Sequence, residues 1–435
     1  MHLQISGGTR LIGSVTASGS KNAALALMAA AMLPAGETVL RGVPRIADIE
    51  VFRSLMASVG VTSTWLDRHT LVISGGDLSE GMPPVELARK MRASYYLMGP
   101  LLGRLGRARV GLPGGCNIGA RPVDLHLKAF AALGARTGIE AGEAWAEARR
   151  LRGAEVTLVG PFGPSVGATI NALLAACVTP GVSRIHGAAQ EPEVVEVAAF
   201  LNRAGARIAG AGTGLIEVEG VSALEAVTYD VPGDRIEAAT YLLAGAATGG
   251  DVRVEGVAPW ALDGLPRLLT QMGCACATEP AGAVRVVAPA RLQAVEAVTG
   301  PFPALATDIQ PVLVAALLRA RGGSLVEERV FDARFGYTSE LERLGAQIRI
   351  VAGQTAVITG VPRLGGAPMS GTDLRATAAL VVGALTAEGE SQVEGLTFLD
   401  RGYEGLEAKL AALGAEIRRV GAPAPAAQKE RSGRA

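Results

Sequence analysis

Apolar and polar positions follow one pattern that recurs six times along the chain. In each copy an apolar, alanine-rich segment with a helical period precedes a short β-branched segment between glycines, a polar loop, a second helical segment and an alternating strand. The second helical segment of each copy ends at a glycine, and these closing glycines are Gly60, Gly134, Gly205, Gly273, Gly345 and Gly414. Their spacings of 74, 71, 68, 72 and 69 residues indicate one folding unit copied six times.

The first copy predicts its elements most clearly. Residues 18–33 predict a helix with Ser18 or Ser20 as its N-cap, residues 36–42 predict a strand framed by glycines, and residues 47–60 predict the second helix. The same glycine frame returns at residues 181–187, 250–256 and 389–395.

Three units of this length make a domain of ordinary size, so the six units predict two domains. No unit has the polar outer face of a capping repeat, which favours closed domains over a linear solenoid. Residues 1–20 alternate like strands but lack a first helix, and we expect them to complete the last repeat. The predicted domains are therefore residues 21–230 and a discontinuous second domain of residues 1–20 plus 231–420. Residues 421–435, rich in proline and alanine and then charged, predict a disordered tail.

Composition narrows the function classes. Of the 435 residues, 49% are hydrophobic and 19% charged, as expected for a folded globular protein, and the formal net charge is zero. This balance gives no indication of a nucleic-acid or membrane-surface binder. The longest apolar stretches, such as 376–387, are too short to span a bilayer, and the first ten residues lack a secretion signal. Four scattered cysteines predict a reducing compartment, so we expect a cytoplasmic, disulfide-free protein.

Charged and polar side chains recur where the helices begin. The residues that open the first helix of each unit lie 67 to 73 positions apart, and they are Lys21, Arg92, Ser165, Arg235, Asp308 and Arg375. Arginines also precede second helices, at Arg121, Arg334 and Arg401. Helix starts present free N–H groups and the positive end of the helix dipole, so this set favours anionic ligands in a cleft between two domains. Any one of these arginines is equally consistent with a solvated loop.

One loop contains a candidate reactive thiol. Glycine and proline surround Cys116 in the segment LPGGCNIGARPVDLH at residues 112–126, and Arg121 follows it closely. Nearby positive charge favours the thiolate, so Cys116 is a candidate nucleophile or acid. For Cys177, Cys274 and Cys276, which lie in helix or strand patterns, we expect structural roles.

Other common sites are not indicated. The sequence has no phosphate-binding P-loop or dinucleotide fingerprint, and its four histidines show no metal spacing. Asp308 and Asp373 both precede apolar helices. A capping role is the simpler interpretation for Asp373, whereas Asp308 is a candidate base because neighbouring cations would keep it ionised.

Several segments together resemble the enolpyruvyl transferase family. They are SGSKNAAL (18–25), MRASYYLMGP (91–100), the Cys116 loop, PSVGAT (164–169), QEPEVVEVAAFL (190–201), DRIEAATYL (234–242), TDIQ (307–310), TDLRA (372–376) and DRGYE (400–404). The match covers essentially residues 1–420 in order. The resemblance implies an α/β (α+β) fold of two domains, each with three βαβαββ repeats around a pseudo-threefold axis, an inside-out α/β barrel.

The resemblance also implies an activity. It is the transfer of the enolpyruvyl group of phosphoenolpyruvate to the 3-hydroxyl of UDP-N-acetylglucosamine with release of phosphate, the first committed step of peptidoglycan synthesis. This places the chain in cell wall biogenesis, cell shape and cell division. No cofactor, metal, nucleic acid, membrane or obligate protein partner is expected.

The implied site residues come from both predicted domains. By analogy Lys21 and Asn22 contact phosphoenolpyruvate, with Arg121 and Arg401 holding its phosphate and carboxylate. Asp308 takes the hydroxyl proton or holds the sugar, and Cys116 protonates the methylene carbon or helps to expel product and is the site of fosfomycin alkylation. The implied substrate-binding set is completed by Arg92, Pro122, Val123, Asp124, Leu125, Ser165, Val166, Gly167, Val330, Arg334, Asp373 and Arg375.

Some positions depart from the family pattern. Ala306 stands where a proline precedes the aspartate, Ile309 replaces a methionine and Gly233 replaces a frequent proline. These changes flank charged residues without altering them. They leave open a paralogue that acts on another uridine nucleotide, or a non-catalytic paralogue that binds a UDP-sugar. The sister enzyme that uses shikimate 3-phosphate is disfavoured, because it lacks the cysteine loop.

Overall fold

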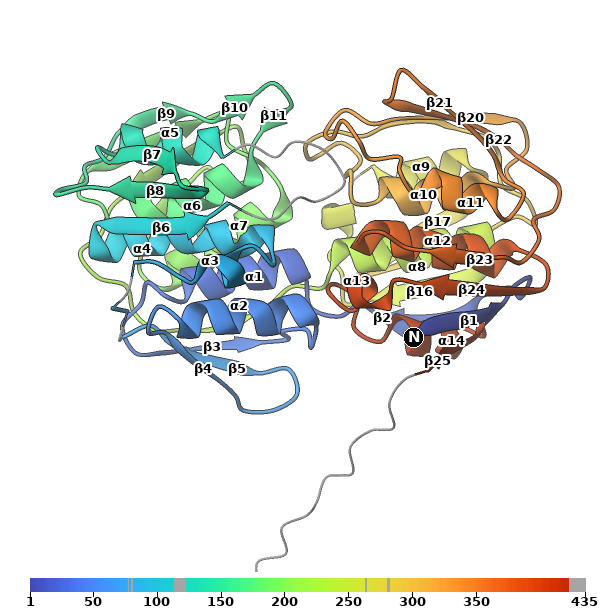
Figure 1. Ribbon diagram of the computed structural model, residues 1–435, viewed down its shortest axis with the longest axis horizontal. Coiled ribbons are helices and arrows are strands. Elements are labelled where there is room, and N and C mark those ends of the chain that lie inside the picture. The colour runs from blue at the N-terminus through green and yellow to red at the C-terminus, as the bar shows by residue number, and fades with distance from the viewer. Residues whose placement is uncertain (77, 80, 113–122, 263, 280–281, 422–435) are drawn as a thin grey trace, which may run out of the picture.

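The computed structural model describes residues 1–76, 78–79, 81–112, 123–262, 264–279 and 282–421. Two lobes lie side by side (Figure 1). One lobe contains the chain from residue 21 to about residue 230, and the other contains both the N-terminal strands and the second half of the chain. The predicted tail from residue 422 onward, as well as Cys116, Arg121 and Pro122, lies outside the described residues.

The helices follow the predicted order of two principal helices per repeat. In the first lobe they are α1 (Lys21–Ala30), α2 (Ala47–Ala57), α3 (Val85–Ala88), the 3₁₀ helix η1 (Arg92–Leu97), α4 (Met98–Leu105), α5 (Asp124–Ala132), α6 (Val166–Ala176) and α7 (Pro192–Arg203). In the second lobe they are α8 (Arg235–Ala247), the 3₁₀ helix η2 (Pro259–Leu262), α9 (Leu265–Gln271), α10 (Gln310–Leu317), α11 (Thr338–Glu342), α12 (Leu374–Thr386), α13 (Leu396–Leu399) and α14 (Leu406–Ala412).

The strands are short. Up to residue 160 they are β1 (His2–Ser6), β2 (Ile12–Thr16), β3 (Glu37–Arg41), β4 (Thr62–Trp65), β5 (Leu71–Ser74), β6 (Arg107–Gly111), β7 (Arg136–Glu140), β8 (Glu143–Glu147), β9 (Glu155–Thr157) and β10 (Val159–Gly160). From there to residue 287 they are β11 (Gly163–Pro164), β12 (Val182–His186), β13 (Arg207–Ala209), β14 (Leu215–Glu219), β15 (Thr228–Asp230), β16 (Asp251–Glu255), β17 (Ala275–Glu279) and β18 (Ala283–Val287). The last are β19 (Glu296–Val298), β20 (Gly323–Glu327), β21 (Gln347–Val351), β22 (Thr355–Thr359), β23 (Pro368–Ser370), β24 (Glu390–Glu394) and β25 (Glu416–Val420).

Each repeat has one sheet, and among the described residues five of these six sheets share one four-stranded design. Within the described residues the strand orders are β15-β3-β5-β4, β6-β8-β7, β9-β12-β14-β13, β2-β16-β18-β17, β19-β20-β22-β21 and β23-β24-β1-β25, and β10 and β11 form a separate ribbon. In the four-stranded sheets the first strand runs parallel to the second, and the other two continue antiparallel. All four glycine frames identified in the sequence enclose the second strand of such a sheet, namely β3, β12, β16 and β24.

Helices lie inside the lobes and sheets outside. In the second lobe α8, α10 and α12 pack against one another, and nearly all their residues are buried. The strands of the sheets alternate buried and exposed side chains, so each sheet covers the helices with one face and meets solvent with the other. Because these helices are buried on all sides, their sequences are apolar throughout and lack the polar face of an amphipathic helix.

Backbone geometry explains the periodic glycines. All six closing glycines have φ between 89° and 102°, a left-handed conformation that a side chain disfavours. Each one ends a helix and turns the chain into the next strand. One expected helix differs: the segment that Arg92 opens begins as the 3₁₀ helix η1 and becomes α-helical only at Met98.

Within the described residues the chain crosses between the lobes twice, and the two crossings pair with each other. Gly19 and Gly233 form an antiparallel bridge. The Ser20 N–H donates to the Pro232 carbonyl at 2.7 Å, and the Asp234 N–H donates to the Ser18 carbonyl at 2.8 Å. The strand before each crossing pairs within the lobe that the chain is leaving: β2 pairs with β16 of the second lobe, and β15 pairs with β3 of the first.

Buried apolar side chains form two clusters. One extends from Ala23 to Val231, and the other combines Leu3 to Ala17 with Ile236 to Ala415. On this basis we propose that the domains are residues 21–230 and residues 1–20 plus 231–420, with boundaries at the crossings. Strand β1 supports this division because it lies between β24 and β25.

Alanine at either crossing glycine should destabilise the fold. An added Cβ would lie 1.8 Å from the Gly42 carbonyl oxygen at Gly19, or 1.8 Å from the Gly256 oxygen at Gly233, so each crossing would have to move away from the backbone it contacts. For Gly19→Ala and Gly233→Ala we expect losses of roughly 2–4 kcal/mol in the free energy of unfolding, measured by urea denaturation. Gly214→Ala is the control, since no atom of the described residues lies within 4 Å of its Cβ position. Equal stability of all three variants would contradict the role of the crossings.

Candidate active site between the lobes

A cavity of about 360 Å³ has walls from both lobes. Its lining is rich in ionisable side chains that begin helices or lie in the turns before them. From the first lobe these are Lys21, Asp48, Arg92, His126, Glu191 and Glu193, and from the second they are Arg235, Asp308, Arg334, Asp373, Arg375 and Arg401.

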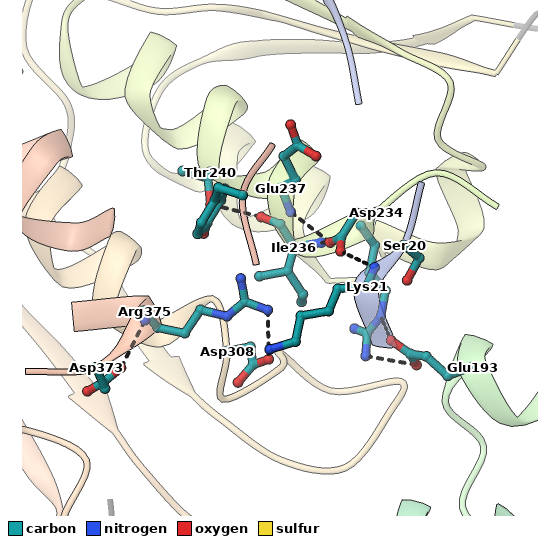
Figure 2. A network of polar contacts seen from close by, with 12 residues as sticks. Ser20, Lys21, Glu193, Asp234, Ile236, Glu237, Thr240, Asp308, Asp373 and Arg375 are labelled. Atoms are coloured by element: carbon teal, nitrogen blue, oxygen red, sulfur yellow. Dashed lines mark hydrogen bonds and ion pairs between the residues drawn. The ribbon is translucent and has the colours of Figure 1, made fainter. Parts of the chain in front are cut away.

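Helix caps fix the backbone positions from which these side chains extend into the cavity. Ser20 caps α1 by accepting from the Ala23 N–H, and Ser165 caps α6 in the same way. Asp234 caps α8 through one carboxylate oxygen, and its other oxygen accepts from the Lys21 N–H at 2.9 Å. The starts of α1 and α8, from different lobes, are thereby held together by one carboxylate (Figure 2).

A first group of charges contains Lys21, Asp48 and Arg401. Lys21 Nζ lies 2.7 Å from Asp48 Oδ2, and Arg401 Nε lies 2.8 Å from Asp48 Oδ1. The Asp48 side chain is only 5% exposed. Burial, the largest single influence, raises the pKa of Asp48, but the charges of Lys21 and Arg401 together outweigh it and hold the pKa below its usual value.

A second group surrounds Asp308. Arg375 Nη2 donates to Asp308 Oδ2 at 3.1 Å, and Arg334 Nη2 lies 3.7 Å from Asp308 Oδ1. Burial raises the pKa of Asp308, but the charges of Arg375, Arg334 and Lys21 together outweigh burial and hold the pKa below its usual value. The carboxyl therefore stays ionised. Lys21, Asp308 and Arg375 point toward one another (Figure 2), which joins the two groups across the cavity.

Asp373 has the capping role that the sequence favoured. Its Oδ1 accepts from the N–H groups of Arg375 and Ala376 at the start of α12 and lies 3.7 Å from Arg334 Nη1. Arg334 and Arg375 are almost fully buried, with side chains 2% and 4% exposed. Arg334 Nη2 and Arg375 Nη1 have no hydrogen-bond partner among the described residues. Since both arginines line the cavity, we expect these nitrogens to donate to a bound ligand.

A third group again joins the lobes. Arg235 donates from Nε and Nη2 to the two carboxylate oxygens of Glu193 at 3.2 and 3.3 Å. Beside it Glu191 accepts from the Phe302 N–H at 3.3 Å. Burial is the main cause that raises the pKa of Glu191.

One wall of the cavity is less charged. His126 lies against Gly167, where an added Cβ would come within 2.7 Å of its Nε2, and its ring is 5.7 Å from that of Tyr95. The Tyr95 hydroxyl and His126 Nδ1 are buried without a hydrogen-bond partner among the described residues. Burial raises the pKa of Tyr95 to about 12, so its hydroxyl keeps its proton.

Most predicted site residues that the structure describes line this cavity. They are Lys21, Asn22, Arg92, Val166, Gly167, Asp308, Arg334, Asp373, Arg375 and Arg401. The structure does not bring Val123, Asp124, Leu125, Ser165 or Val330 into the described lining. Val123 and Asp124 begin α5, Ser165 caps α6, and Val330 lies next to the lining residue Phe331.

Sequence reasoning found Asp308 and Asp373 but missed three other carboxylates of the cavity. Asp48, Glu191 and Glu193 lie at the starts of α2 and α7, positions at which only cations were sought. The usable signal was the acidic pair in each segment, ADIE at 47–50 and EPE at 191–193. Arg235 was found as a recurring helix start but was left out of the candidate site. His126 lies in the cavity wall with its Nδ1 lacking a hydrogen-bond partner among the described residues.

The cysteines outside the cavity fit structural roles. Burial raises the pKa of Cys177 to about 12 and that of Cys274 to about 11, so neither forms a thiolate readily.

Across the described ranges no group of histidines, cysteines and carboxylates has an arrangement that would hold a metal ion. None of the helices described above is long and apolar enough to cross a membrane.

Comparisons with known proteins agree with this architecture. The family model of EPSP synthase (3-phosphoshikimate 1-carboxyvinyltransferase) matches residues 5–410. The chain is 45% identical to UDP-N-acetylglucosamine 1-carboxyvinyltransferase of Trichlorobacter lovleyi, over 97% of this chain and 99% of that protein. It is also 45% identical to the protein of the same name from Prochlorococcus marinus, over 96% of each chain.

Solved structures confirm the predicted fold class. The enolpyruvyl transferase NikO from Streptomyces tendae superposes with a TM-score of 0.85 at 27% identity, over 97% of this chain and 99% of that one. EPSP synthase from Acinetobacter baumannii superposes with a TM-score of 0.72 at 18% identity, over 96% and 100% of the two chains, which is a likeness of fold alone.

Stability should depend on pH through His126. Burial, assisted by the charge of Arg92, lowers the pKa of His126 from 6.5 to about 3. Between these values the unfolded chain binds a proton that the folded chain does not, so stability falls as the pH drops below 6.5. Between pH 8 and pH 5 this one residue should remove about 2 kcal/mol.

The measurement is urea unfolding of the wild type and His126→Gln at pH 8, 6.5 and 5. The wild type should lose about 2 kcal/mol more than the variant over the acid range. His186→Gln, at a side chain that is 45% exposed, is the control and should follow the wild type. Parallel pH curves for all three proteins would show that His126 is protonated in the folded state.

Proposed function

Because the chain belongs to the EPSP synthase family of enolpyruvyl transferases, we propose that it transfers the enolpyruvyl group of phosphoenolpyruvate to the 3-hydroxyl of UDP-N-acetylglucosamine and releases phosphate. The observation that carries the choice of substrate is the near-complete coverage of relatives named UDP-N-acetylglucosamine 1-carboxyvinyltransferase. The cavity supports the chemistry, since cations from both lobes converge in it. A role in peptidoglycan synthesis and a cytoplasmic location belong to the same proposal.

The reaction needs strong anion binding and three proton transfers, two in the addition and one in the elimination. The sugar oxygen forms a bond to C2 of phosphoenolpyruvate and gives up its proton, while C3 receives one. The C2–O bond to phosphate then breaks and C3 loses a proton, so the enolpyruvyl ether and inorganic phosphate are the products. Phosphate and carboxylate groups share one carbon during this sequence, and that crowding of negative charge requires fixed cations.

Lys21 and Arg401 are the proposed cations for phosphoenolpyruvate. Both lie on the same carboxylate, Asp48, and come from different lobes. A lysine ammonium has three N–H donors and an arginine has five, so each keeps donors for a ligand after binding Asp48. Asn22, Arg92, Arg334 and Arg375 complete the proposed polar lining.

Asp308 is the proposed base or sugar-holding residue. Its neighbours hold its pKa well below the usual range, which makes it a weak base while the cavity contains only these cations. Anionic substrates would oppose the field of Arg375, Arg334 and Lys21 and raise the pKa toward its ordinary value. Asp308 would thus become an effective base only after phosphoenolpyruvate binds.

The direct test is phosphate release by the purified protein with both substrates. We expect turnover with UDP-N-acetylglucosamine and none with shikimate 3-phosphate. No turnover with either acceptor would overturn the proposal. Tight binding of the UDP-sugar without phosphate release would favour a non-catalytic paralogue, and turnover with a different uridine nucleotide would favour a paralogous transferase.

Asp308→Asn should lower kcat by about 100-fold or more, the usual contribution of a general base. The amide keeps the shape of the side chain but accepts no proton. Asp251→Asn is the matched control, because Asp251 also pairs with an arginine, Arg285, but on an outer sheet. A kcat within threefold of the wild type for Asp308→Asn would show that another group takes the proton.

Cys116 is proposed as the proton donor to the methylene carbon and as the fosfomycin target, on the sequence alone. Cys116→Ser should lower phosphate release strongly. Mass spectrometry after exposure to fosfomycin should find one adduct on the wild type and none on the variant. An adduct that persists in Cys116→Ser would exclude Cys116 as the target.

A further inference from the structure

Asp48 is a cavity carboxylate to which the proposed reaction assigns no step. It is the second residue of α2 and is 3% exposed. Each of its oxygens faces a different cation, with Oδ2 at 2.7 Å from Lys21 Nζ and Oδ1 at 2.8 Å from Arg401 Nε. The carboxylate therefore bridges the two cations.

The bridge lies where the lobes touch. Asp48 and Lys21 belong to the first lobe, and Arg401 follows α13 in the second. The adjoining backbone is docked in the same place, since the Ala47 N–H donates to the Asp400 carbonyl at 2.9 Å and the Arg45 N–H donates to Glu404 Oε2 at 3.0 Å. Arg401 thus reaches the cavity from a segment that is fixed against the start of α2.

Two cations aimed at one anion repel each other when that anion is absent. A buried carboxylate between them removes this repulsion and gives each side chain one preferred orientation. Asp48 suits the task because it is ionised, is short enough to be rigid and lies in the first turn of α2, where the helix dipole favours negative charge.

We propose that Asp48 is a positioning residue for phosphoenolpyruvate. It holds Lys21 and Arg401, one from each lobe, so that their remaining N–H groups point toward the same bound phosphoenolpyruvate. Ligand binding and lobe docking are coupled through this carboxylate. The inference rests on the proposed function and deepens it, because it assigns a preorganising role at the phosphoenolpyruvate end of the cavity.

A merely structural ion pair predicts a different result. If Asp48 only stabilised the lobe contact, its loss would change both substrates alike or lower the melting temperature alone. A positioning role instead separates the two substrates, since Lys21 and Arg401 are the proposed ligands of phosphoenolpyruvate. The KM values for the two substrates are therefore the decisive readout.

The experiment compares wild type, Asp48→Asn, Asp48→Glu and Glu50→Gln in the full-length protein. Glu50 is the matched control: it lies on the same helix, is 49% exposed, and pairs with Arg53. For Asp48→Asn we expect the KM for phosphoenolpyruvate to rise at least tenfold and the KM for UDP-N-acetylglucosamine to stay within twofold. Glu50→Gln should match the wild type in both.

Asp48→Glu keeps the charge but moves it by one methylene, and it tests the inference even if Asp48→Asn fails to fold. Its KM for phosphoenolpyruvate should rise severalfold, again without a change for the UDP-sugar. An unchanged KM for phosphoenolpyruvate in the folded variants, or equal changes for both substrates, would overturn the positioning role.

Failure of the proposed function would be seen separately. A wild type without turnover would overturn that function, and calorimetry with inorganic phosphate would then test Asp48 directly. Phosphate should bind about tenfold more weakly to Asp48→Asn than to the wild type and Glu50→Gln. Equal phosphate affinity in all three proteins would overturn the positioning role independently of any reaction.

Discussion

The pairing of the two chain crossings is the constraint on which the rest of the structure depends. Gly19 and Gly233 approach so closely to neighbouring carbonyl groups that no side chain fits at either position. The next residues, Ser20 and Asp234, cap α1 and α8, so the backbone hydrogen bonds between the crossings also fix where these two helices start. Lys21 and Arg235 therefore enter the cavity from positions set by the backbone.

The same constraint makes the cavity electrostatically demanding. Helix starts from two lobes bring positive dipole ends and cationic side chains into one space, which would be unfavourable without compensation. Carboxylates supply it in each group: Asp48 for Lys21 and Arg401, Asp308 for Arg375, and Glu193 for Arg235. Two of these four pairings join residues of different lobes, namely Arg401 with Asp48 and Arg235 with Glu193. The charge balance of the cavity thus depends on the contact between the lobes.

The sequence predicted the repeat, the fold class and the cationic side of the site, because glycine spacing and helix starts are local signals. The glycine frames around β3, β12, β16 and β24 correspond to strands, and Ser20 caps α1 as expected. Strand order is not a local signal. Tertiary packing places β1 between β24 and β25, and it pairs β2 with β16 and β15 with β3. The role of Asp48 was equally hidden, since Arg401 is 353 positions away in the sequence.

Repetition gives positions, and the side chain at each position decides its chemistry. A serine caps the first helix of the first and third units, Ser20 and Ser165, yet the residue after the cap is the charged Lys21 in one unit and the apolar Val166 in the other. In the third unit Gly167 leaves room that His126 fills, so this start contributes shape instead of charge. A periodic pattern therefore locates the wall of the cavity, but it does not say which part of the wall binds anions. That distinction comes from the carboxylate partners, because a cation held by a buried carboxylate keeps a fixed direction, whereas an unpaired one would turn to solvent.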